Sequence, residues 1–519
     1  MLKKMGGVRS YSQSCRLVTR FPPEPNGPLH VGHLKSLSLN ISLAKKTGGC
    51  CLLRFDDTNP KTERRRHVSS IIKILCWLGL QTVLPCFASD NYALFFSCAL
   101  VLIKNQLLYI DHQDPEHHRT NRGTFSSFGS DSHARAQPLT DNIRQLKQMG
   151  FGRFRSQTKT LKAKLNMMDP NPILRDPILC RISFSSHHKT KHFWSLYPTY
   201  DYAQCISDCG EGITHSFCTL EFESNRPLYN QILTLLTKAH ILAAITELPK
   251  QIEFSRLSVN KLLTSKRQVR RLVLIRAVNC CDDLRLGTIV SMRRAGFTKS
   301  SLWAFAGNQG MSRSPSQFSL AGIHTSIKKE LGRCAPQKMA IIRSSEFVIE
   351  NFGSKTQLLI SIPNSSEVPS FSGKSRLVCC ERILIETANV IKFLQPQSDL
   401  VLQLEFSLKI RLAGIVRTPD GGLIGRGRLV WDDLIGASFV EKAMRLCWTC
   451  ANYNRRISTG LLQIERCGLL PNQPSNVSLL PNEWESKGLR FQAVGRGYFV
   501  VDIKTDKAKA NRWNFITRM

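Results

Sequence analysis

Acidic residues are scarce in this sequence. Only 38 Asp and Glu stand against 72 Lys and Arg among 519 residues, which gives a formal charge of +34. A surface of that composition repels itself unless an anion covers it, and nucleic acid is the commonest partner of this kind. Drift of surface positions towards Lys and Arg is the alternative, because net charge reports on association and not on fold.

Long apolar runs and a secretory signal are absent. The longest apolar run, Ala93 to Ile103, is too short to cross a bilayer and is followed by Lys104. Residues 1–14 are basic and free of acids, which is compatible with a targeting segment or with an ordinary start. We therefore expect a cytoplasmic protein that does not associate with membranes.

A disulfide framework is also missing. The 18 cysteines include adjacent pairs at 50–51, 280–281 and 379–380, and neighbouring cysteines are poor disulfide partners. Cys447 and Cys450 form a C-x-x-C motif without a second pair at zinc-finger spacing. The pattern indicates a reducing compartment, and we expect no protein-bound metal.

The first hundred residues alternate short apolar strands with amphipathic helices. Residues 16–21 and 50–57 read as strands, and residues 27–48 and 67–79 read as helices that close on glycine. Strand, helix, strand, helix is typical of a parallel α/β nucleotide-binding fold.

The rest of the chain changes character three times. Residues 111–192 are basic and irregular, with one clear helix at 140–150, and look like an insertion into the α/β pattern. The α/β pattern resumes near residue 193, and residues 257–335 read as mostly helical. Beyond residue 335 the apolar segments are β-like and are separated by turns such as Pro419 to Gly422, which predicts barrels or sandwiches.

The stretch "PPEPNGPLHVGH" is the most unusual motif. Pro28 suits the first position of a helix, and Asn26 or Gly27 could cap that helix. His30 and His33 would then lie one turn apart on the same face. Two satisfied surface histidines are the simpler explanation of an isolated H-x-x-H, but the turn in front of this one argues against it.

This motif suggests a chemistry of phosphate binding. A helix N-terminus attracts phosphate through its free N–H groups and its dipole. Gly32 removes a side chain where an adenine or ribose could lie on the backbone. The two imidazoles could donate hydrogen bonds to a phosphate whose charge grows in a transition state.

Ordered motifs along the chain resemble the class I aminoacyl-tRNA synthetases, and among them the glutaminyl branch. In chain order, the motifs are "PPEPNGPLHVGH", "LRFDDTNP", "YPTYDYAQCISD", "EGITHSFCTLEF", "EFSRL" and "LLTSKR". His30 to His33 correspond to the HIGH signature, and Thr264 to Lys266 correspond to the mobile KMSKS-type loop. The resemblance is strong to about residue 300 and loose after 355.

The resemblance implies a domain plan. Residues 15–110 and 193–256 would be the two halves of a Rossmann-like α/β catalytic domain, and residues 111–192 an inserted acceptor-stem-binding domain. Residues 257–335 would form a helical stem-contact subdomain with the TSK loop. Residues 336–519 would form an all-β barrel region that binds the anticodon. A monomer is expected.

The resemblance also implies a reaction in two steps. The carboxylate of glutamine attacks the α-phosphate of ATP, releasing diphosphate, and the terminal ribose of tRNA(Gln) then takes the glutaminyl group and releases AMP. No side chain need act as a nucleophile, so catalysis would rest on positioning and charge stabilisation. Mg²⁺ is expected on the triphosphate.

Site residues follow from the matching motifs. His30, His33 and Lys266 would be catalytic, and Asp56, Tyr200 and Cys218 would hold the amino acid, with Asp56 on its ammonium group. Singly, each has an ordinary explanation as a turn, half-buried or solvated residue. The residues implied in ATP binding are Glu24, Pro25, Asn26, His30, Gly32, His33, Arg256, Leu257, Thr264, Ser265 and Lys266.

Glutamate is the rival substrate, through the archaeal and eukaryotic type of glutamyl-tRNA synthetase. That branch usually has serine at the position of Asn26 and tends to have arginine at that of Cys218. A guanidinium at the latter position would pair a substrate carboxylate, whereas a thiol does not. These details favour glutamine.

A tRNA-binding paralogue without catalysis is the remaining alternative, but His30, His33 and Lys266 are all present. We expect Lys162, Lys164, Arg293 and Arg294 to face RNA phosphates.

Several positions depart from the family pattern. They are Thr264 for a methionine, Gln204 for a histidine, Ser224 for an aspartate that reads the acceptor stem, and Pro28 for a tyrosine.

Overall fold

The structure is a computed structural model. It describes residues 17–80 and 85–335 apart from 157, 244, 246, 260–262, 264, 315 and 319, and beyond residue 335 it describes chiefly strands. The chain divides into two compact units. One unit is Met1–Cys281 with Ala306–Phe318, and the other is Asp282–Phe305 with Ser319–Met519.

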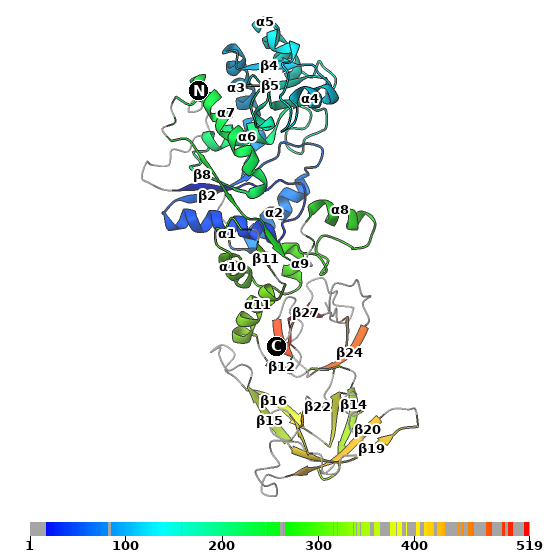
Figure 1. Cartoon of the computed structure of the whole chain (residues 1–519). Helices are drawn as coiled ribbons and strands as arrows, with labels where there is room; N and C mark the ends of the chain where they lie inside the picture. Colours follow the sequence, from blue (N-terminus) through cyan, green and yellow to red (C-terminus); the bar gives the residue numbers. More distant parts are fainter. Residues whose placement is uncertain are drawn as a thin grey trace. The chain divides into compact units, whose positions relative to one another are not determined.

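A parallel α/β sheet forms the centre of the first unit. Three strands pair in parallel in the order β1-β2-β3, and the register aligns Val18 with Cys50. Helix α1 packs against β1 and β2 (Figure 1). The predicted alternation of strand and helix is confirmed. Its elements are β1 (Val18–Phe21), α1 (Val31–Lys46), β2 (Cys50–Phe55), α2 (Arg65–Trp77) and β3 (Cys86–Phe87).

A second parallel pair, β8 (His215–Thr219) with β9 (Lys250–Phe254), continues this arrangement. The backbone amide of Thr214 donates to the Val18 carbonyl at 2.9 Å, which brings the start of β8 beside β1. Helices α3 (Tyr92–Lys104), α6 (Tyr200–Gly210) and α7 (Arg226–Lys238) contribute buried apolar side chains to one hydrophobic core.

The predicted insertion contains a four-stranded antiparallel sheet, in the order β4-β5-β6-β7. The helix expected at 140–150 is confirmed as α5 (Leu139–Gly150), with Pro138 at its N-cap. That these residues are a separate acceptor-binding domain stays a prediction. The other elements are β4 (Leu108–Asp111), α4 (Pro115–Arg122), β5 (Thr160–Ala163), β6 (Ile178–Ile182) and β7 (Leu196–Pro198).

Lys162 corrects one expectation about this region. Its side chain is 4% exposed and forms an ion pair with Asp111, because β5 turns it into the sheet. It therefore cannot face an RNA phosphate. Lys164 and Arg293 are exposed, as expected, and Arg294 is half-buried.

Residues 257–335 are mostly helical, as predicted. A short parallel pair, β10 (Leu257–Val259) with β11 (Ser316–Phe318), accompanies the helices. The helices are α8 (Lys266–Leu274), α9 (Ile289–Arg294), α10 (Lys299–Gly307) and α11 (Leu320–Cys334).

Beyond residue 335, nearly all regular structure in the described residues is strand, which confirms the β-like reading. Seven strands form one sheet in the order β21-β18-β19-β20-β14-β17-β22. In this sheet Arg417 pairs with Leu423, although residues 420–422 of the predicted turn lie outside the described residues. A closed barrel and anticodon binding stay predictions. The sheet's strands are β14 (Ser344–Ile349), β17 (Arg382–Glu386), β18 (Val401–Leu404), β19 (Lys409–Arg417), β20 (Leu423–Val430), β21 (Met444–Leu446) and β22 (Trp448–Cys450).

Smaller sheets complete this region. Their orders are β12-β25-β26-β27, β13-β24-β23 and β15-β16. In the described part of the chain, no helix has both the length and the apolar character needed to span a membrane. The strands are β12 (Gln337–Lys338), β13 (Ala340–Ile342), β15 (Leu358–Pro363), β16 (Lys374–Cys379), β23 (Arg455–Gly460), β24 (Pro474–Leu479), β25 (Arg490–Ala493), β26 (Gly497–Val501) and β27 (Trp513–Thr517).

Candidate active site

Helix α1 begins at Val31, and its cap is built from the two histidines of the motif. His30 is the N-cap, and its Nδ1 accepts the backbone N–H of Gly32 at 3.1 Å. The Nδ1 of His33 accepts the backbone N–H of His30 at 3.0 Å, which completes a reciprocal capping box. The expected caps at Asn26 or Gly27 are therefore wrong, since the helix starts three residues after Pro28.

Burial keeps both imidazoles neutral, and the cap decides which ring nitrogen carries the proton. Burial lowers the pKa of His30 to about 3 and that of His33 well below its usual range, and the charge of Lys266 adds to both effects. A neutral imidazole that accepts at Nδ1 has its proton on Nε2. Both rings, whose centroids are 3.9 Å apart, thus keep an Nε2–H donor that the cap does not use.

The cap also explains Gly32. A Cβ at this position would lie 2.9 Å from Cε1 and 3.0 Å from Nδ1 of His30. The imidazole of His30 therefore occupies the direction in which a side chain would point from position 32, and contact of the Gly32 backbone with a nucleotide stays a prediction. Gly32 is needed so that His30 can fold back on the helix start.

Replacing Gly32 by Ala is expected to push the His30 ring out of its cap and to lower the stability of α1 by about 1 kcal/mol. The displaced ring should also lower ATP-dependent adenylate formation at least tenfold, because the donor then leaves its position. Diphosphate exchange and thermal unfolding measure the two effects. Gly307→Ala is the control, since no atom lies within 4 Å of a Cβ there. Full activity of Gly32→Ala would contradict the explanation.

The second signature meets the first at Lys266. Its Nζ donates to Asn26 Oδ1 at 2.7 Å and to the Glu24 carbonyl at 3.2 Å. The stem of Lys266 packs on Gly27, where a Cβ would lie 3.3 Å from its Cδ. Burial lowers the pKa of the amine. The amine is thus placed against the turn that leads into His30.

The remaining predicted ATP residues surround this point. Pro25 is buried in the turn, and Asn26 also donates to the Glu24 carboxylate. The Ser265 hydroxyl caps α8 by accepting from the backbone N–H of Gln268. Thr264 lies outside the described residues.

Leu257 is the first residue of β10, and Arg256 is the residue before it; both lie near the two histidines. The charge of Arg256 contributes to the lowered pKa of His30, so the guanidinium is within electrostatic reach of the ring. Arg256 also donates to Glu221 at 2.8 Å. The Leu257 carbonyl lies 3.5 Å from the position of a Gly32 Cβ, which places β10 against the start of α1.

The three residues predicted to hold the amino acid also lie together. Asp56 follows β2 and is 5% exposed, and its Oδ1 accepts from Arg54 Nε at 2.8 Å. Its Oδ2 is buried and has no hydrogen-bond partner among the described residues. Burial raises the pKa of Tyr200, and the neighbouring Cys218 and Asp56 raise it further. A buried, unpaired carboxylate oxygen beside a phenol is suited to an ammonium group.

Cys218 is reached by two donors. Arg20 Nη2 and Gln204 Nε2 each approach its Sγ at 3.5 Å, and Gln204 also donates to the Ser216 hydroxyl at 3.0 Å. Gln204, at the position where the resemblance expects a histidine, is therefore buried beside Cys218 as an amide donor. Ser224 instead lies in a 3₁₀ turn, where its hydroxyl donates to Asn225 at 3.3 Å.

Sequence reasoning missed a buried group of charges beneath Asp56. Arg54 Nη1 donates to Asp208 at 2.7 Å and to Glu211 at 2.9 Å, and Arg20 pairs with Asp208 at 3.3 Å. The available signal was an arginine near the end of each of two otherwise apolar parallel strands. Such strands are buried on both faces, so a charge in them needs a buried partner.

A second polar cluster consists of Asp57, the residue after Asp56, with His187 and His188. Asp57 Oδ2 lies 3.0 Å from His188 Nε2 and 3.5 Å from His187 Nε2, and these three residues have the proximity of metal ligands. His187 Nδ1, however, accepts the N–H groups of Lys189 and Thr190. The ring proton therefore sits on Nε2, which donates to the Asp57 carbonyl at 3.0 Å and has no lone pair for a cation.

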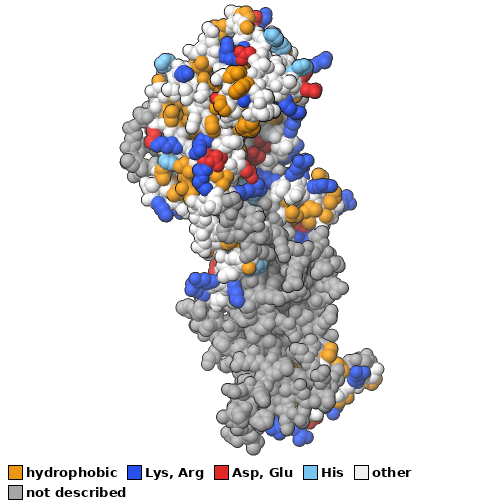
Figure 2. Space-filling view, in the orientation of Figure 1, with side chains coloured by type: hydrophobic (Ala, Val, Ile, Leu, Met, Phe, Trp, Pro, Cys, Tyr) orange, Lys and Arg blue, Asp and Glu red, His pale blue; other side chains and the backbone are white. Residues whose placement is uncertain are grey.

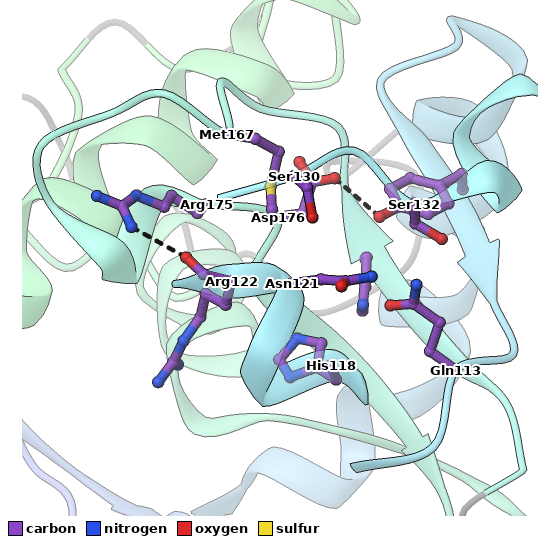
Figure 3. Close-up of a pocket in the computed structure, with 11 residues that line it drawn as sticks. Gln113, His118, Asn121, Arg122, Ser130, Ser132, Met167, Arg175 and Asp176 are labelled. Carbon is purple, nitrogen blue, oxygen red and sulfur yellow. Dashed lines mark hydrogen bonds between the residues drawn. The ribbon is translucent and has the colours of Figure 1, made fainter. Parts of the chain in front are cut away.

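Two cavities lie outside the ATP and amino-acid residues. A cleft of about 560 Å³ is lined by His187 and His188 together with Glu63, Arg64 and Lys191. The other, of about 10 Å³, has room for one water molecule and lies among side chains of the β4–β7 region (Figure 3). There Arg175 donates to the carbonyl of Arg122, the last residue of α4, and the cavity is too small for a substrate.

Comparison with known proteins identifies the class. The family described as tRNA synthetases class I (E and Q), catalytic domain, matches residues 16–332. That span includes the capped histidines, the lysine that meets them, and Asp56, Tyr200 and Cys218. The chain therefore belongs to the class I tRNA synthetases of the glutamate and glutamine group.

Individual relatives narrow the group. The glutamine--tRNA ligase of Cupriavidus metallidurans is 36% identical over 420 residues, which are 79% of this chain and 72% of that protein. That of Haemophilus influenzae is 40% identical over 372 residues, 72% of this chain and 65% of that protein. Within the group, the chain is a member of the glutamine--tRNA ligase family, and it is an aminoacyl-tRNA synthetase.

A solved structure was also matched. A glutamate tRNA ligase from Elizabethkingia meningosepticum aligns with a TM-score of 0.43 and 17% identity, over 61% of this chain and 70% of that chain.

Proposed function

We propose that the chain joins L-glutamine to tRNA(Gln) through a glutaminyl-adenylate, with ATP as the energy source. The observation that carries this proposal is the meeting of the two signatures, in which Lys266 lies 2.7 Å from Asn26 in the turn that leads to His30. Glu63 is within electrostatic reach of both Glu24 and Asp56, so the ATP residues and the amino-acid pocket adjoin.

The first step would use positioned donors and no protein nucleophile. Asp56 holds the α-ammonium and thereby directs the glutamine carboxylate at the α-phosphate, whose bond to the diphosphate breaks as the new P–O bond forms. The Nε2–H groups of His30 and His33 and the amine of Lys266 stabilise charge on the phosphate oxygens. In the second step a ribose hydroxyl of tRNA attacks the glutaminyl carbonyl, and AMP leaves.

Mg²⁺ fits this site only through the nucleotide. The cations that act on the histidine pair, Lys266 and Arg256, suit phosphates, and the Glu24 carboxylate nearby accepts from Asn26. Mg²⁺ held by the triphosphate would neutralise part of its charge when bound.

The pocket favours glutamine over glutamate. Cys218 brings no cation of its own, and the nearby Arg20 is paired with Asp208 at 3.3 Å. A substrate carboxylate would therefore be buried without a free guanidinium to meet it, which is costly. The relatives described above carry the name of the glutamine enzyme.

The surface is suited to tRNA as the partner. Lys and Arg side chains are spread over the visible face of the described residues (Figure 2). With a formal charge of +34, RNA affinity should fall steeply with salt because bound phosphates release counterions.

Charging of total tRNA with labelled glutamine and, separately, labelled glutamate tests the proposal. We expect glutamine to be attached and glutamate to be attached at a rate lower by at least about a hundredfold, as the unpaired buried carboxylate predicts. Attachment of glutamate alone would transfer the chain to the glutamyl branch. Attachment of neither, with tRNA still bound, would support a binding protein without catalysis.

A further inference from the structure

Five ionisable side chains form a closed group beneath the amino-acid pocket, which we call the buried charge cluster: Arg20, Arg54, Asp56, Asp208 and Glu211. Arg54 is its centre, since its Nε donates to Asp56 at 2.8 Å and its Nη1 to Asp208 and Glu211 at 2.7 and 2.9 Å. Four of the five side chains are buried, and the fifth, Glu211, is 11% exposed.

The cluster contains more negative than positive groups. Two guanidinium groups face three carboxylates, and the main electrostatic partners of each carboxylate are other members of the cluster. Two carboxylate oxygens, Asp56 Oδ2 and Glu211 Oε1, are buried without a hydrogen-bond partner among the described residues. Within the described part of the chain, Arg54 Nη2 is buried without a partner as well. When all three carboxylates are ionised, the cluster holds one surplus negative charge, which is costly to bury and which one further cation would balance.

The surrounding groups do not supply that cation. Glu63 lies beside Asp56, and burial raises its pKa to about 9, so it is neutral near pH 7. Tyr200 is neutral as well, because burial raises its pKa. Asp57, the next residue along the chain, is held by Ser89 at 2.7 Å and by His188 at 3.0 Å.

We propose that the α-ammonium of the amino-acid substrate completes this cluster, and that Glu211 is a positioning residue that sets amino-acid affinity through Arg54. Glu211 does not touch the substrate. It shares the Arg54 guanidinium with Asp56, so its charge determines how much of that guanidinium's charge is left to neutralise Asp56. The inference rests on the proposed function, because it assumes that Asp56 binds the substrate ammonium.

The inference has a consequence for pH. Burial raises the pKa of Glu211 to about 7, with Arg54 opposing the shift. As the pH rises from 6 to 8, Glu211 therefore ionises and the cluster gains one negative charge. The KM for glutamine should fall about fivefold across this range, as expected for one charge acting over a short distance in a medium of intermediate dielectric constant.

The test is Glu211→Gln, which keeps an oxygen that can accept from Arg54 but carries no charge. We expect its KM for glutamine at pH 8 to be about fivefold that of the unmodified enzyme and to stay constant from pH 6 to 8. The KM for ATP and kcat should change less than about twofold, because the substituted group acts on ammonium binding alone. Glu211→Asp, which restores the charge, should restore the pH dependence.

Glu247→Gln is the matched control, because it removes the same charge at a side chain that is 64% exposed. It should behave as the unmodified enzyme at every pH. The inference is overturned if the KM of Glu211→Gln keeps its pH dependence, or if the control shifts equally. If Glu211→Gln does not fold, the same decision rests on Glu211→Asp and on the unmodified enzyme, whose KM must fall with rising pH. If the unmodified enzyme attaches neither glutamine nor glutamate, the proposed function fails first.

Discussion

Replacing His30 by Asn should lower the rate of adenylate formation by about a hundredfold to a thousandfold, the usual effect of losing one donor to a developing oxyanion. Asn is among the preferred N-cap residues, so its Oδ1 can still accept the backbone N–H of Gly32. What disappears is the imidazole Nε2–H, which the cap does not use. Diphosphate exchange under saturating ATP and glutamine measures the rate.

Two controls separate this role from helix stability. His30→Ala removes both the cap and the donor, and should unfold more easily than His30→Asn by about 1 kcal/mol. Since burial lowers the pKa of His30 to about 3, the ring stays neutral and its contribution to the rate should not change from pH 5 to 8. Unimpaired adenylate formation in His30→Asn would show that the ring serves only as a cap.

The same lowered pKa has a consequence for stability. The unfolded chain binds a proton at His30 below pH 6.5, whereas the folded chain does not until about pH 3. The stability contributed by this residue is therefore fully present above pH 6.5 and is lost as the pH falls towards 3.

Replacing Asp208 by Ala should destabilise the unit that contains it by about 3 to 5 kcal/mol. The carboxylate is fully buried and lies 3.3 Å from Arg20 Nε and 2.7 Å from Arg54 Nη1. It also accepts the Tyr229 hydroxyl at 3.0 Å. Its removal takes a hydrogen-bonded carboxylate from two buried guanidinium groups and leaves the Tyr229 hydroxyl without its acceptor. Thermal or denaturant unfolding measures the loss.

The loss is large compared with the total stability of an ordinary domain, so low yield of folded Asp208→Ala is part of the expected result. Asp208→Asn keeps the shape of the side chain, and its stability should lie between that of Asp208→Ala and that of the unmodified chain. Asp141→Ala is the surface control, since Asp141 is 39% exposed and pairs with Arg144 at 2.8 Å, and it should cost less than about 1 kcal/mol. Equal effects of the buried and exposed substitutions would contradict the importance of the cluster.

Regular elements were predictable wherever the pattern of apolar residues was local. The strand before the turn, the strand at Cys50–Phe55 and the helices that flank it follow from periodicity and terminal glycines. The predominance of helix in residues 257–335 and of strand afterwards could be read in the same way. These patterns are local because a helix or strand face repeats within a few residues.

The cap of α1 could not be read in this way. Pro28 and Asn26 are good residues for a helix start, yet the helix begins at Val31 because the His30 ring accepts the N–H of Gly32 and the His33 ring accepts that of His30. Capping by histidine is rare enough that propensity alone points elsewhere. The same geometry explains why residue 32 is a glycine, since a Cβ there would meet the His30 ring.

The sequence by itself determined the ordered motifs, and through them the family and the reaction class. The residues that would meet ATP and glutamine stay predictions from the same motifs. Only the tertiary structure decided which charges neutralise one another. Lys162 is a basic residue in a basic segment, and nothing nearby in the chain shows that Asp111 buries it. The buried charge cluster likewise joins residues from Arg20 to Glu211. Such pairs depend on how strands are placed side by side, and that placement is not encoded by any one segment.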